Sequence, residues 1–457
     1  MAAQEPLVFT VTRKSPELIR PATQTPHEYK LLSDIDDQQG LRLKIANVQI
    51  YRTKNEVQNL DPVKVIREAL AKTLVFYYPF AGRLREGAGM KLGVDCTGEG
   101  ALFVEADADV TLEQFGDEIQ PPFPCFGEFL ADVPGYGITL DCPLLHVQVT
   151  RLKCGGFILA SQINHTMSDA AGVVQFLTAL SEIARGAAAP STPPVWQREL
   201  LSARDSPRIT CTHPQYDQNV PVIDDLPVRD LRSYFFGPNE IRAINQLIPP
   251  HIGKYSSFDI LTAFLWRCRT RALQLGPQEE VRISCFVNTR AKFNPVLPKG
   301  YYGNACLNPQ AVTTAGKLCD GPFTHALELV KKLKQGITEE YVKSVADLMV
   351  LKGRPRFSMP RTYTVSDLTR AGFGDVDFGW GRPAYGGPPG CGVEMGISEV
   401  SFYIPHTNKN GEKGMIVPVC LPASALDKFE VELNSMLKNN SQVALIDNTS
   451  LPIMSAL

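Results

Sequence analysis

The sequence predicts a mixed α/β protein with two lobes, and three observations support that prediction. Its 457 residues are enough for two or three compact units of about 150 residues each. Segments with strand and helix periodicity alternate along both halves of the chain. Between the halves, prolines recur too often for a regular ladder. We therefore expect an N-terminal lobe over residues 1–190, a proline-rich crossover linker over 191–231 and a C-terminal lobe over 232–457.

The first half of the chain reads as strands interleaved with helices. Residues 42–51 alternate loosely at period two, as a strand does, whereas residues 63–74 space their apolar side chains as an amphipathic helix does. Residues 157–163 form an apolar run of strand length, and a helix is expected to begin at Ser168 or Asp169. Further strands are expected at 92–96, 102–105 and 144–152.

The second half repeats this alternation. A strand is expected at 233–236, followed by helices at 239–247 and 257–273 and a strand at 281–287. No internal repeat interrupts the pattern, so a solenoid is excluded.

Composition excludes several classes of partner. The 46 Lys and Arg against 48 Asp and Glu leave a net charge of −2, which gives no long-range field for nucleic acid or an anionic membrane surface. No apolar window has the length of a membrane span. The 11 cysteines form no C-x-x-C pair and fit a reducing, cytoplasmic compartment. A peroxisomal location is a second expectation, because Ser455, Ala456 and Leu457 keep the outer residues of an S-K-L tail without its basic middle.

Several common catalytic signatures do not occur in the sequence. It has no G-x-x-x-x-G-K-[ST] phosphate loop, no G-x-S-x-G nucleophile elbow and no H-E-x-x-H metal helix. The seven histidines never pair at metal-ligand spacing. We expect neither a metal nor a redox cofactor.

The most informative segment begins at His165, where an apolar strand is expected to end and a helix to follow. Imidazole titrates near neutrality, so a histidine at such a corner can take the proton of a hydroxyl as that hydroxyl attacks. Asp169 follows four residues later, and the spacing leaves open whether it faces the histidine or forms a supporting ion pair elsewhere. The structural alternative is a core histidine bonded to a backbone carbonyl and an aspartate that caps the helix.

A second unusual segment lies far downstream and holds one of only three tryptophans among glycines and prolines. Its central residues are Asp377, Phe378, Gly379, Trp380 and Gly381. Taken alone, it reads as a tight turn anchored by aromatic side chains, in which Asp377 accepts hydrogen bonds from local amides.

Together the two segments resemble the signature pair of the plant BAHD acyl-CoA-dependent acyltransferases, H-x-x-x-D and, near the C-terminal end, D-F-G-W-G. The second motif matches at all five positions, whereas Ala170 stands where many members have glycine after the aspartate. Residues 78–84, 287–290 and 302–305 also look like family segments in family order. The resemblance therefore covers essentially the whole chain.

The resemblance implies two lobes, each like a chloramphenicol acetyltransferase subunit, with a tunnel at their interface. In such a tunnel His165 would act as the general base, without a covalent acyl-enzyme. Asp169 would turn away from the substrates into an ion pair, for which Arg290 is the candidate partner. Residues 377–381 would shape the CoA side from outside the catalytic centre. Candidate oxyanion donors are the Trp380 indole N–H or nearby backbone amides.

Acyl-CoA would be a co-substrate, and its phosphates need cations or free amides at the tunnel mouth. Ser256 and Ser257 open a helix that offers such amides, and they are the candidate CoA-binding residues. Weaker candidates are the later arginines of that helix, for which a solvated face is the simpler reading: Arg267, Arg269 and Arg271. Apolar and aromatic residues proposed as pocket walls are Ile35, Phe378 and Phe402.

Within the family, residues 32–38, 77–79, 82–87 and 370–374 closely resemble the alcohol acyltransferases and benzyl alcohol O-benzoyltransferases. This favours transfer of a benzoyl group from benzoyl-CoA to a small alcohol such as benzyl alcohol, giving an ester such as benzyl benzoate. Acetyl transfer from acetyl-CoA to aliphatic alcohols is the near alternative. Two further alternatives are a noncatalytic member that only binds a small ligand and a hydrolase that uses water at His165. A monomer is expected on family grounds.

Overall fold

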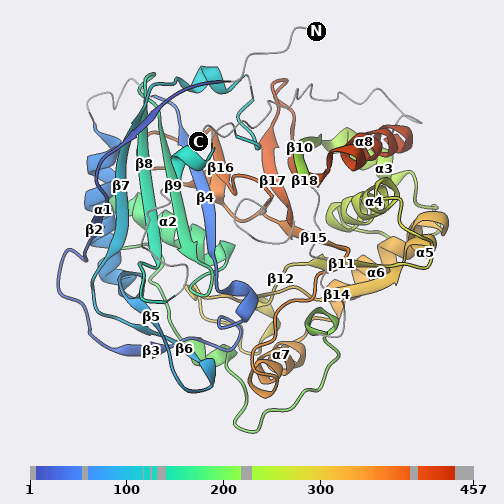
Figure 1. Ribbon diagram of the computed structural model, residues 1–457, viewed down its shortest axis with the longest axis horizontal. Helices are drawn as coiled ribbons and strands as arrows, with labels where there is room; N and C mark the ends of the chain where they lie inside the picture. The colour runs from blue at the N-terminus through green and yellow to red at the C-terminus, as the bar shows by residue number, and fades with distance from the viewer. Residues whose placement is uncertain are drawn as a thin grey trace.

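Two mixed β-sheets, each covered by helices, form the body of the protein (Figure 1). The computed structural model describes residues 7–53, 60–116, 118–123, 126–130, 140–217, 229–391 and 400–437. In this part of the chain strands and helices alternate, which confirms the mixed α/β class predicted from the sequence.

The first sheet has seven strands and contains both parallel and antiparallel neighbours. Helices α1 (Pro62–Phe76) and α2 (Ala170–Ala184) pack on one face of it, where their apolar side chains share a core with the strands. The strand order is β1 (Val11–Arg13), β7 (Ala101–Ala108), β8 (Leu145–Leu152), β9 (Phe157–Asn164), β4 (Lys44–Tyr51) and β16 (Tyr385–Gly387), with β2 (Glu17–Ile19) also paired to β7.

The second sheet has six strands and its own apolar core, which centres on the almost wholly buried helix α4 (Ser257–Ala272). Its strand order is β10 (Arg229–Phe236), β18 (Lys413–Pro422), β17 (Val400–Thr407), β15 (Thr362–Asp367), β11 (Glu280–Cys285) and β14 (Gln310–Thr314). The helices near α4 are α3 (Pro238–Asn245), α5 (Ala315–Asp320), α6 (Phe323–Gln335) and α8 (Ala423–Leu437).

Two small sheets complete the described strands. One consists of β3 (Tyr29–Leu31), β6 (Leu92–Asp95) and β5 (Arg83–Glu86), and the other of β12 (Val287–Asn288) and β13 (Cys306–Leu307). Helix α7 (Glu339–Leu351), at the bottom of Figure 1, contributes to a third apolar cluster that also contains Ile35.

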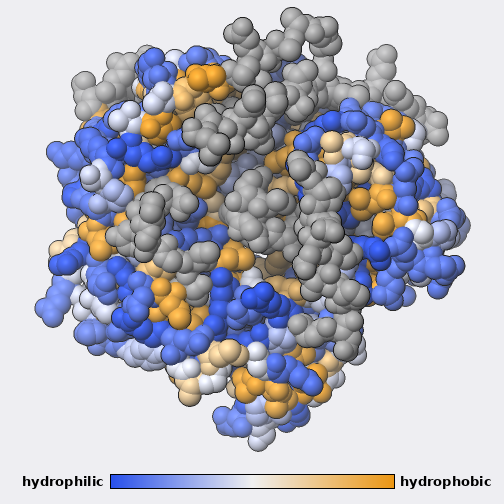
Figure 2. Space-filling model, in the orientation of Figure 1, coloured by the Kyte–Doolittle hydropathy of each residue, from blue (hydrophilic) through white to orange (hydrophobic). Residues whose placement is uncertain are grey.

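The two sheets meet in a buried apolar layer. Val48 and Ile158 of the first sheet share a cluster with Ile404 and Ile416 of the second. Because these residues are almost fully buried, the lobes are packed together rather than tethered loosely. The face shown in Figure 2 is mostly hydrophilic, with apolar residues in small groups, and is hollowed near its centre.

One late segment of the chain packs with the first sheet. Residues 368–380 come late in the chain, yet Phe373, Phe378 and Trp380 belong to the core of the first sheet. Strand β16, just after them, pairs with β4 at the edge of that sheet. The D-F-G-W-G motif therefore packs with the N-terminal lobe, which differs from its predicted place in the C-terminal lobe. The boundaries at 190 and 231 stay a prediction.

Most predicted elements occur within a few residues of the expected positions. Helix α4 ends at Ala272 and strand β4 begins at Lys44, close to the predicted limits. In the described part of the linker, residues 191–217 form short 3-10 turns and an isolated bridge from Val195 to Tyr301, as repeated prolines require. Within the described ranges, no helix has the length and apolar composition needed to cross a membrane.

Candidate active site

His165 lies in the turn between strand β9 and helix α2, at one end of the first sheet. Its backbone N–H donates to the Leu43 carbonyl at 2.8 Å, which continues the pairing of β9 with the chain that enters β4. The residue is only partly buried, unlike its neighbours Thr166 and Met167. The histidine is thus held at the sheet end without being sealed in the core.

The imidazole is oriented by a hydrogen bond within its own turn. Nδ1 lies 3.1 Å from the Ser168 carbonyl oxygen. Because a carbonyl can only accept, Nδ1 carries the proton and Nε2 keeps its lone pair. The Asn304 side chain also interacts with the ring and raises its pKa, and Nε2 is the ring nitrogen whose lone pair is available to a substrate. This is the tautomer that a general base requires.

The surroundings of His165 also favour the neutral ring. Burial lowers its pKa, and the hydrogen bonds of the turn and the Asp169 charge offset only part of that effect. The net pKa therefore lies below the ordinary histidine value of about 6.5. At neutral pH the ring is unprotonated and can accept a proton.

This pKa gives a testable pH dependence. A protonated Nε2 cannot accept the alcohol proton, so kcat/KM should be constant near neutrality and fall on the acid side. We expect the inflection below about pH 6.5 because burial lowers the pKa of His165. The measurement is kcat/KM by thiol release from about pH 4.5 to about pH 8. An inflection clearly above the ordinary histidine value would contradict this account.

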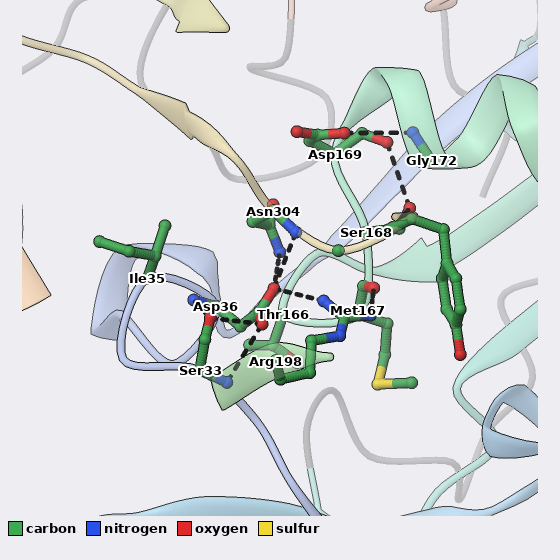
Figure 3. A network of polar contacts seen from close by, with 12 residues as sticks. Ser33, Ile35, Asp36, Thr166, Met167, Ser168, Asp169, Gly172, Arg198 and Asn304 are labelled. Carbon is green, nitrogen blue, oxygen red and sulfur yellow. Dashed lines mark hydrogen bonds and ion pairs between the residues drawn. The ribbon is translucent and has the colours of Figure 1, made fainter. Parts of the chain in front are cut away.

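Asp169 caps helix α2, with its carboxylate directed at the Gly172 N–H (Figure 3). Its Oδ1 accepts from the Gly172 N–H at 3.1 Å, and its Oδ2 accepts from the Ala305 N–H at 2.9 Å. Arg290 supplies the ion pair, with Nη1 2.8 Å from Oδ2 and Nη2 2.9 Å from Oδ1. Spacing left open whether Asp169 faces the histidine or forms a supporting ion pair. The structure shows the ion pair, and it is bidentate.

The charge of Asp169 is retained although its side chain is buried. Burial raises the pKa of the carboxyl, but the Arg290 guanidinium and the backbone N–H donors outweigh it, so the pKa is lowered overall. Arg290 also donates to the Gly303 carbonyl at 2.7 Å. The pair therefore ties the start of α2 to the segment around residue 303.

The change from the common family pattern at Ala170 leaves this geometry intact. Helix α2 approaches the chain at Tyr302 most closely through Gly172, where an added Cβ would lie 2.1 Å from the Tyr302 carbonyl oxygen. Ser168 Oγ donates to the same carbonyl at 2.7 Å. The close approach requires a glycine at residue 172 rather than at residue 170.

The D-F-G-W-G segment forms a tight turn that packs against the first sheet. Asp377 Oδ1 accepts from the Gly379 N–H at 2.7 Å and from the Gly381 N–H at 2.8 Å. The two glycines have φ values of +108° and +85°, which other residues rarely adopt. Phe378 packs edge-on against Tyr51, and Trp380 packs edge-on against Phe157.

These contacts lie at the opposite end of the sheet from the histidine. Phe157 begins strand β9 and His165 follows its end, so at about 3.3 Å per residue the two are roughly 25 Å apart. Trp380 therefore cannot donate to an oxyanion at His165, and Phe378 cannot line a pocket there. Both expectations were wrong because Phe378 and Trp380 are buried in the core of the first sheet, a long-range contact that the local sequence does not reveal. The role of residues 377–381 on the CoA side stays a prediction.

Replacement of Trp380 should therefore affect folding more than chemistry. Trp380→Ala removes a side chain that is only 6% exposed, and the free energy of unfolding should fall by about 3–5 kcal/mol. Because the indole is far from His165, the kcat of the folded protein should not change. Urea denaturation and kcat per folded molecule measure the two quantities. A normally stable variant without turnover would instead indicate a direct role in catalysis.

The residues proposed for CoA binding lie on helix α4. Ser256 is the N-cap, and its hydroxyl and the Asp259 carboxylate form a reciprocal capping box. Ser256 and Ser257 are both exposed, and their role towards CoA stays a prediction. The later arginines are occupied within the protein: Arg267 and Arg271 each donate to the Cys319 carbonyl at 2.6 Å, and Arg269 is buried against Tyr363.

Two other candidates for pocket walls differ in their surroundings. Ile35 is fully buried in the third apolar cluster, so it is a core residue and not an exposed wall. Phe402 on β17 is partly buried and packs against both the first core and the layer between the sheets. In the described part of the chain, no group of three or more His, Cys, Asp and Glu is arranged to hold a metal ion.

Sequence reasoning missed a second set of polar residues at the same turn. Asp36, Arg198 and Asn304 converge on the backbone of residues 165–167 (Figure 3). Asp36 and Asn304 lie within segments already noted for their family resemblance, whereas Arg198 lies in the linker and matches no motif.

Comparisons with known proteins agree with the site. The family described as the Transferase family matches residues 9–436. Benzyl alcohol O-benzoyltransferase of Petunia hybrida is 61% identical over 96% of each chain. Alcohol acyl transferase 1 allele GSa of Malus domestica is 52% identical over 98% of this chain and 99% of its own.

Solved structures show the same fold. Vinorine synthase has a TM-score of 0.71 at 20% identity and covers 93% of this chain and 98% of its own. TRI101 of F. graminearum, in a complex with coenzyme A and deoxynivalenol, has a TM-score of 0.69 at 15% identity over 88% of this chain and 97% of its own.

The fold, the neutral histidine and these matches define an acyltransferase. The chain belongs to the BAHD family of acyl-CoA-dependent acyltransferases, as its two motifs indicated. Members of this family use CoA thioesters as co-substrates.

Proposed function

We propose that the protein transfers a benzoyl group from benzoyl-CoA to the hydroxyl of benzyl alcohol and releases benzyl benzoate and free CoA. The observation that carries the reaction type is a neutral His165 whose Nδ1 donates to the Ser168 carbonyl, so that Nε2 is the basic nitrogen. The choice of substrates rests on the 61% identity with a protein named benzyl alcohol O-benzoyltransferase.

The geometry supports a direct transfer with one base. His165 Nε2 accepts the hydroxyl proton as the alcohol oxygen attacks the thioester carbonyl, and a tetrahedral intermediate forms. When the intermediate collapses, the carbon–sulfur bond breaks and the same imidazole returns the proton to the CoA thiolate. The Nδ1 hydrogen bond to Ser168 stabilises the imidazolium that exists between these steps. General base catalysis of this kind contributes about 10²- to 10⁴-fold, so substrate alignment must supply much of the rest.

The test is a screen of acyl donors against alcohols with the purified full chain. Benzoyl-CoA and acetyl-CoA are each combined with benzyl alcohol, with aliphatic alcohols and with water alone, and both thiol release and product identity are recorded. We expect the highest kcat/KM for benzoyl-CoA with benzyl alcohol. Pocket contacts discriminate similar substrates by only about 1–3 kcal/mol, so several alcohols should react.

The same screen separates the alternatives. A preference for acetyl-CoA with aliphatic alcohols would identify an acetyl-transferring alcohol acyltransferase. Thiol release with free acid as the product would identify a hydrolase. Saturable binding of a small ligand without thiol release for any pair would indicate a noncatalytic member, and would overturn the proposal.

A further inference from the structure

Besides the Asp169–Arg290 pair, two buried side chains donate hydrogen bonds to the turn that carries His165 (Figure 3). Arg198 Nη2 donates to the Met167 carbonyl at 2.8 Å, and Asn304 Nδ2 donates to the His165 carbonyl at 2.7 Å. Both bonds go to the backbone of the turn, so they restrain its path whatever side chains it bears.

One carboxylate oxygen fixes both donors. Asp36 Oδ1 accepts from Arg198 Nη1 at 2.7 Å and from Asn304 Nδ2 and backbone N at 2.9 and 2.8 Å. Its Oδ2 accepts from the Ser33 backbone N–H at 3.2 Å and also from the Ser33 hydroxyl. Asp36, Arg198 and Asn304 are each no more than 2% exposed, so water does not weaken these bonds by competition.

The guanidinium of Arg198 has little freedom to move. It lies over the rings of Trp196 and Tyr302, 4.5 and 5.0 Å from their centroids. The backbone at Gly303 is so close that an added Cβ would lie 1.8 Å from Nη1. Arg198 is therefore a rigid bridge between Asp36 and the turn, and a planar fork is needed to reach both.

We propose that Asp36, Arg198 and Asn304 are positioning residues for His165, an inference that rests on the proposed function. The Nδ1 hydrogen bond ends on the Ser168 carbonyl, which lies in the same turn as the two restrained carbonyls. If those carbonyls shift, the Ser168 carbonyl shifts with them, and the tautomer and direction of Nε2 are no longer set. The Asp169–Arg290 pair acts separately, because it holds the start of helix α2.

This inference gives the linker a role in catalysis. Arg198 comes from the linker, Asp36 from the N-terminal segment and Asn304 from the C-terminal lobe, so three remote parts of the chain meet at one turn. A displacement of about 1 Å of a catalytic group can cost about 100-fold in rate, so such convergence has a measurable consequence.

Three substitutions test the proposal by steady-state kinetics with benzoyl-CoA and benzyl alcohol. Arg198→Met removes the fork, Arg198→Lys keeps the charge and the ring contacts with one nitrogen instead of two, and Asn304→Ala leaves the Asp36–Arg198 pair intact. We expect kcat to fall about 100-fold in Arg198→Met and about 10-fold in the other two, with KM for both substrates nearly unchanged.

Arg204→Met is the matched control. Arg204 lies on the same linker and pairs with the fully buried Asp347 at 2.6 Å, but its contacts are with α7 and the linker itself. We expect this variant to lose thermal stability and to keep its kcat. A merely structural role of Arg198 would produce the same result at both positions, with lower stability and unchanged kcat of the folded protein.

A second readout does not depend on turnover. In protein labelled with ¹⁵N-histidine, the His165 resonances, identified by their loss in His165→Ala, report the tautomer. We expect a fixed Nδ1–H tautomer in the wild type and exchange between tautomers in Asn304→Ala. If the wild type forms no ester, the proposed function fails, and the tautomer then decides the positioning proposal alone.

The outcomes are separable. Wild-type kcat together with an unchanged tautomer in both Asn304→Ala and Arg198→Lys would overturn the proposal. Arg198→Met leaves Asp36 buried without its cation. If that variant does not fold, Asn304→Ala and Arg198→Lys still test the proposal.

Discussion

Replacement of His165 by alanine should lower kcat by about 10²- to 10⁴-fold or more while the protein stays folded. The ring is partly exposed and its polar contacts are with the Ser168 carbonyl and the Asn304 side chain, so its loss removes little packing. The loss of Nε2, in contrast, removes the group proposed to accept the alcohol proton. The measurement is thiol release and ester formation from benzoyl-CoA and benzyl alcohol, with the melting temperature recorded in parallel.

Two further variants make this result specific. His165→Asn keeps an N–H donor near the position of Nδ1 for the Ser168 carbonyl but has no basic nitrogen, so it should be as inactive as alanine. His213→Ala removes a buried histidine elsewhere in the protein, whose Nε2 lies 2.8 Å from Ser344 Oγ, and should reduce stability with little effect on kcat. If His165→Ala keeps most of its turnover, the imidazole is not the base and the mechanism is wrong.

The catalytic turn could be predicted because its signals are local. The end of an apolar strand, a polar turn and an aspartate at a helix start all lie within a few residues, and strand β9 and helix α2 occur there. Spacing did not decide the direction of Asp169, because its partner Arg290 is 121 residues away. That partner was proposed from family resemblance and not from the pattern itself.

The elements that escaped prediction depend on long-range contacts. Arg198 and Asp36 are 162 residues apart, and nothing near Arg198 distinguishes it from the other arginines of a proline-rich linker. Strand β16 has only three residues, too few for any periodicity, so its pairing with β4 gave no signal. The arginines of α4 looked solvated, yet two of them donate to the carbonyl of Cys319, a backbone group that no side-chain pattern reveals.

The orientation of His165 depends on the backbone of its turn, and the site is more than a pair of catalytic side chains. Nδ1 of the His165 ring donates to the Ser168 carbonyl, and the orientation of the ring depends on that backbone group. The same turn is held by the Asp169–Arg290 pair at the start of helix α2 and by Arg198 and Asn304, which donate to the Met167 and His165 carbonyls. Substitutions on either side should therefore lower kcat through geometry.

Asp169→Ala should lower both stability and turnover. It leaves Arg290 without its partner carboxylate, removes the helix cap at Gly172 and leaves the Ala305 N–H unpaired. Breaking one side of such a pair typically costs about 3–5 kcal/mol. The free energy of unfolding, from urea denaturation, should fall by this amount, and kcat should fall as well because the turn loses its support.

The pH dependence of this loss has a definite sign. The pKa of Asp169 is lowered in the folded protein, so the stabilisation it provides is fully present above the ordinary aspartate value of about 3.9. It is lost as the pH falls through the lower folded value. The difference in stability between the wild type and Asp169→Ala should therefore be constant near neutrality and shrink in strong acid.

A double-mutant cycle with Arg290→Met distinguishes a structural role of Asp169 from a catalytic one. Removing both charges leaves no unpaired ion, so Asp169→Ala/Arg290→Met should be more stable than the sum of the single losses predicts. Its kcat should remain low, since the turn is still unsupported. If Asp169→Ala instead melts like the wild type and still forms no ester, the carboxylate takes part in the reaction directly, and a purely geometric role for it would have to be given up.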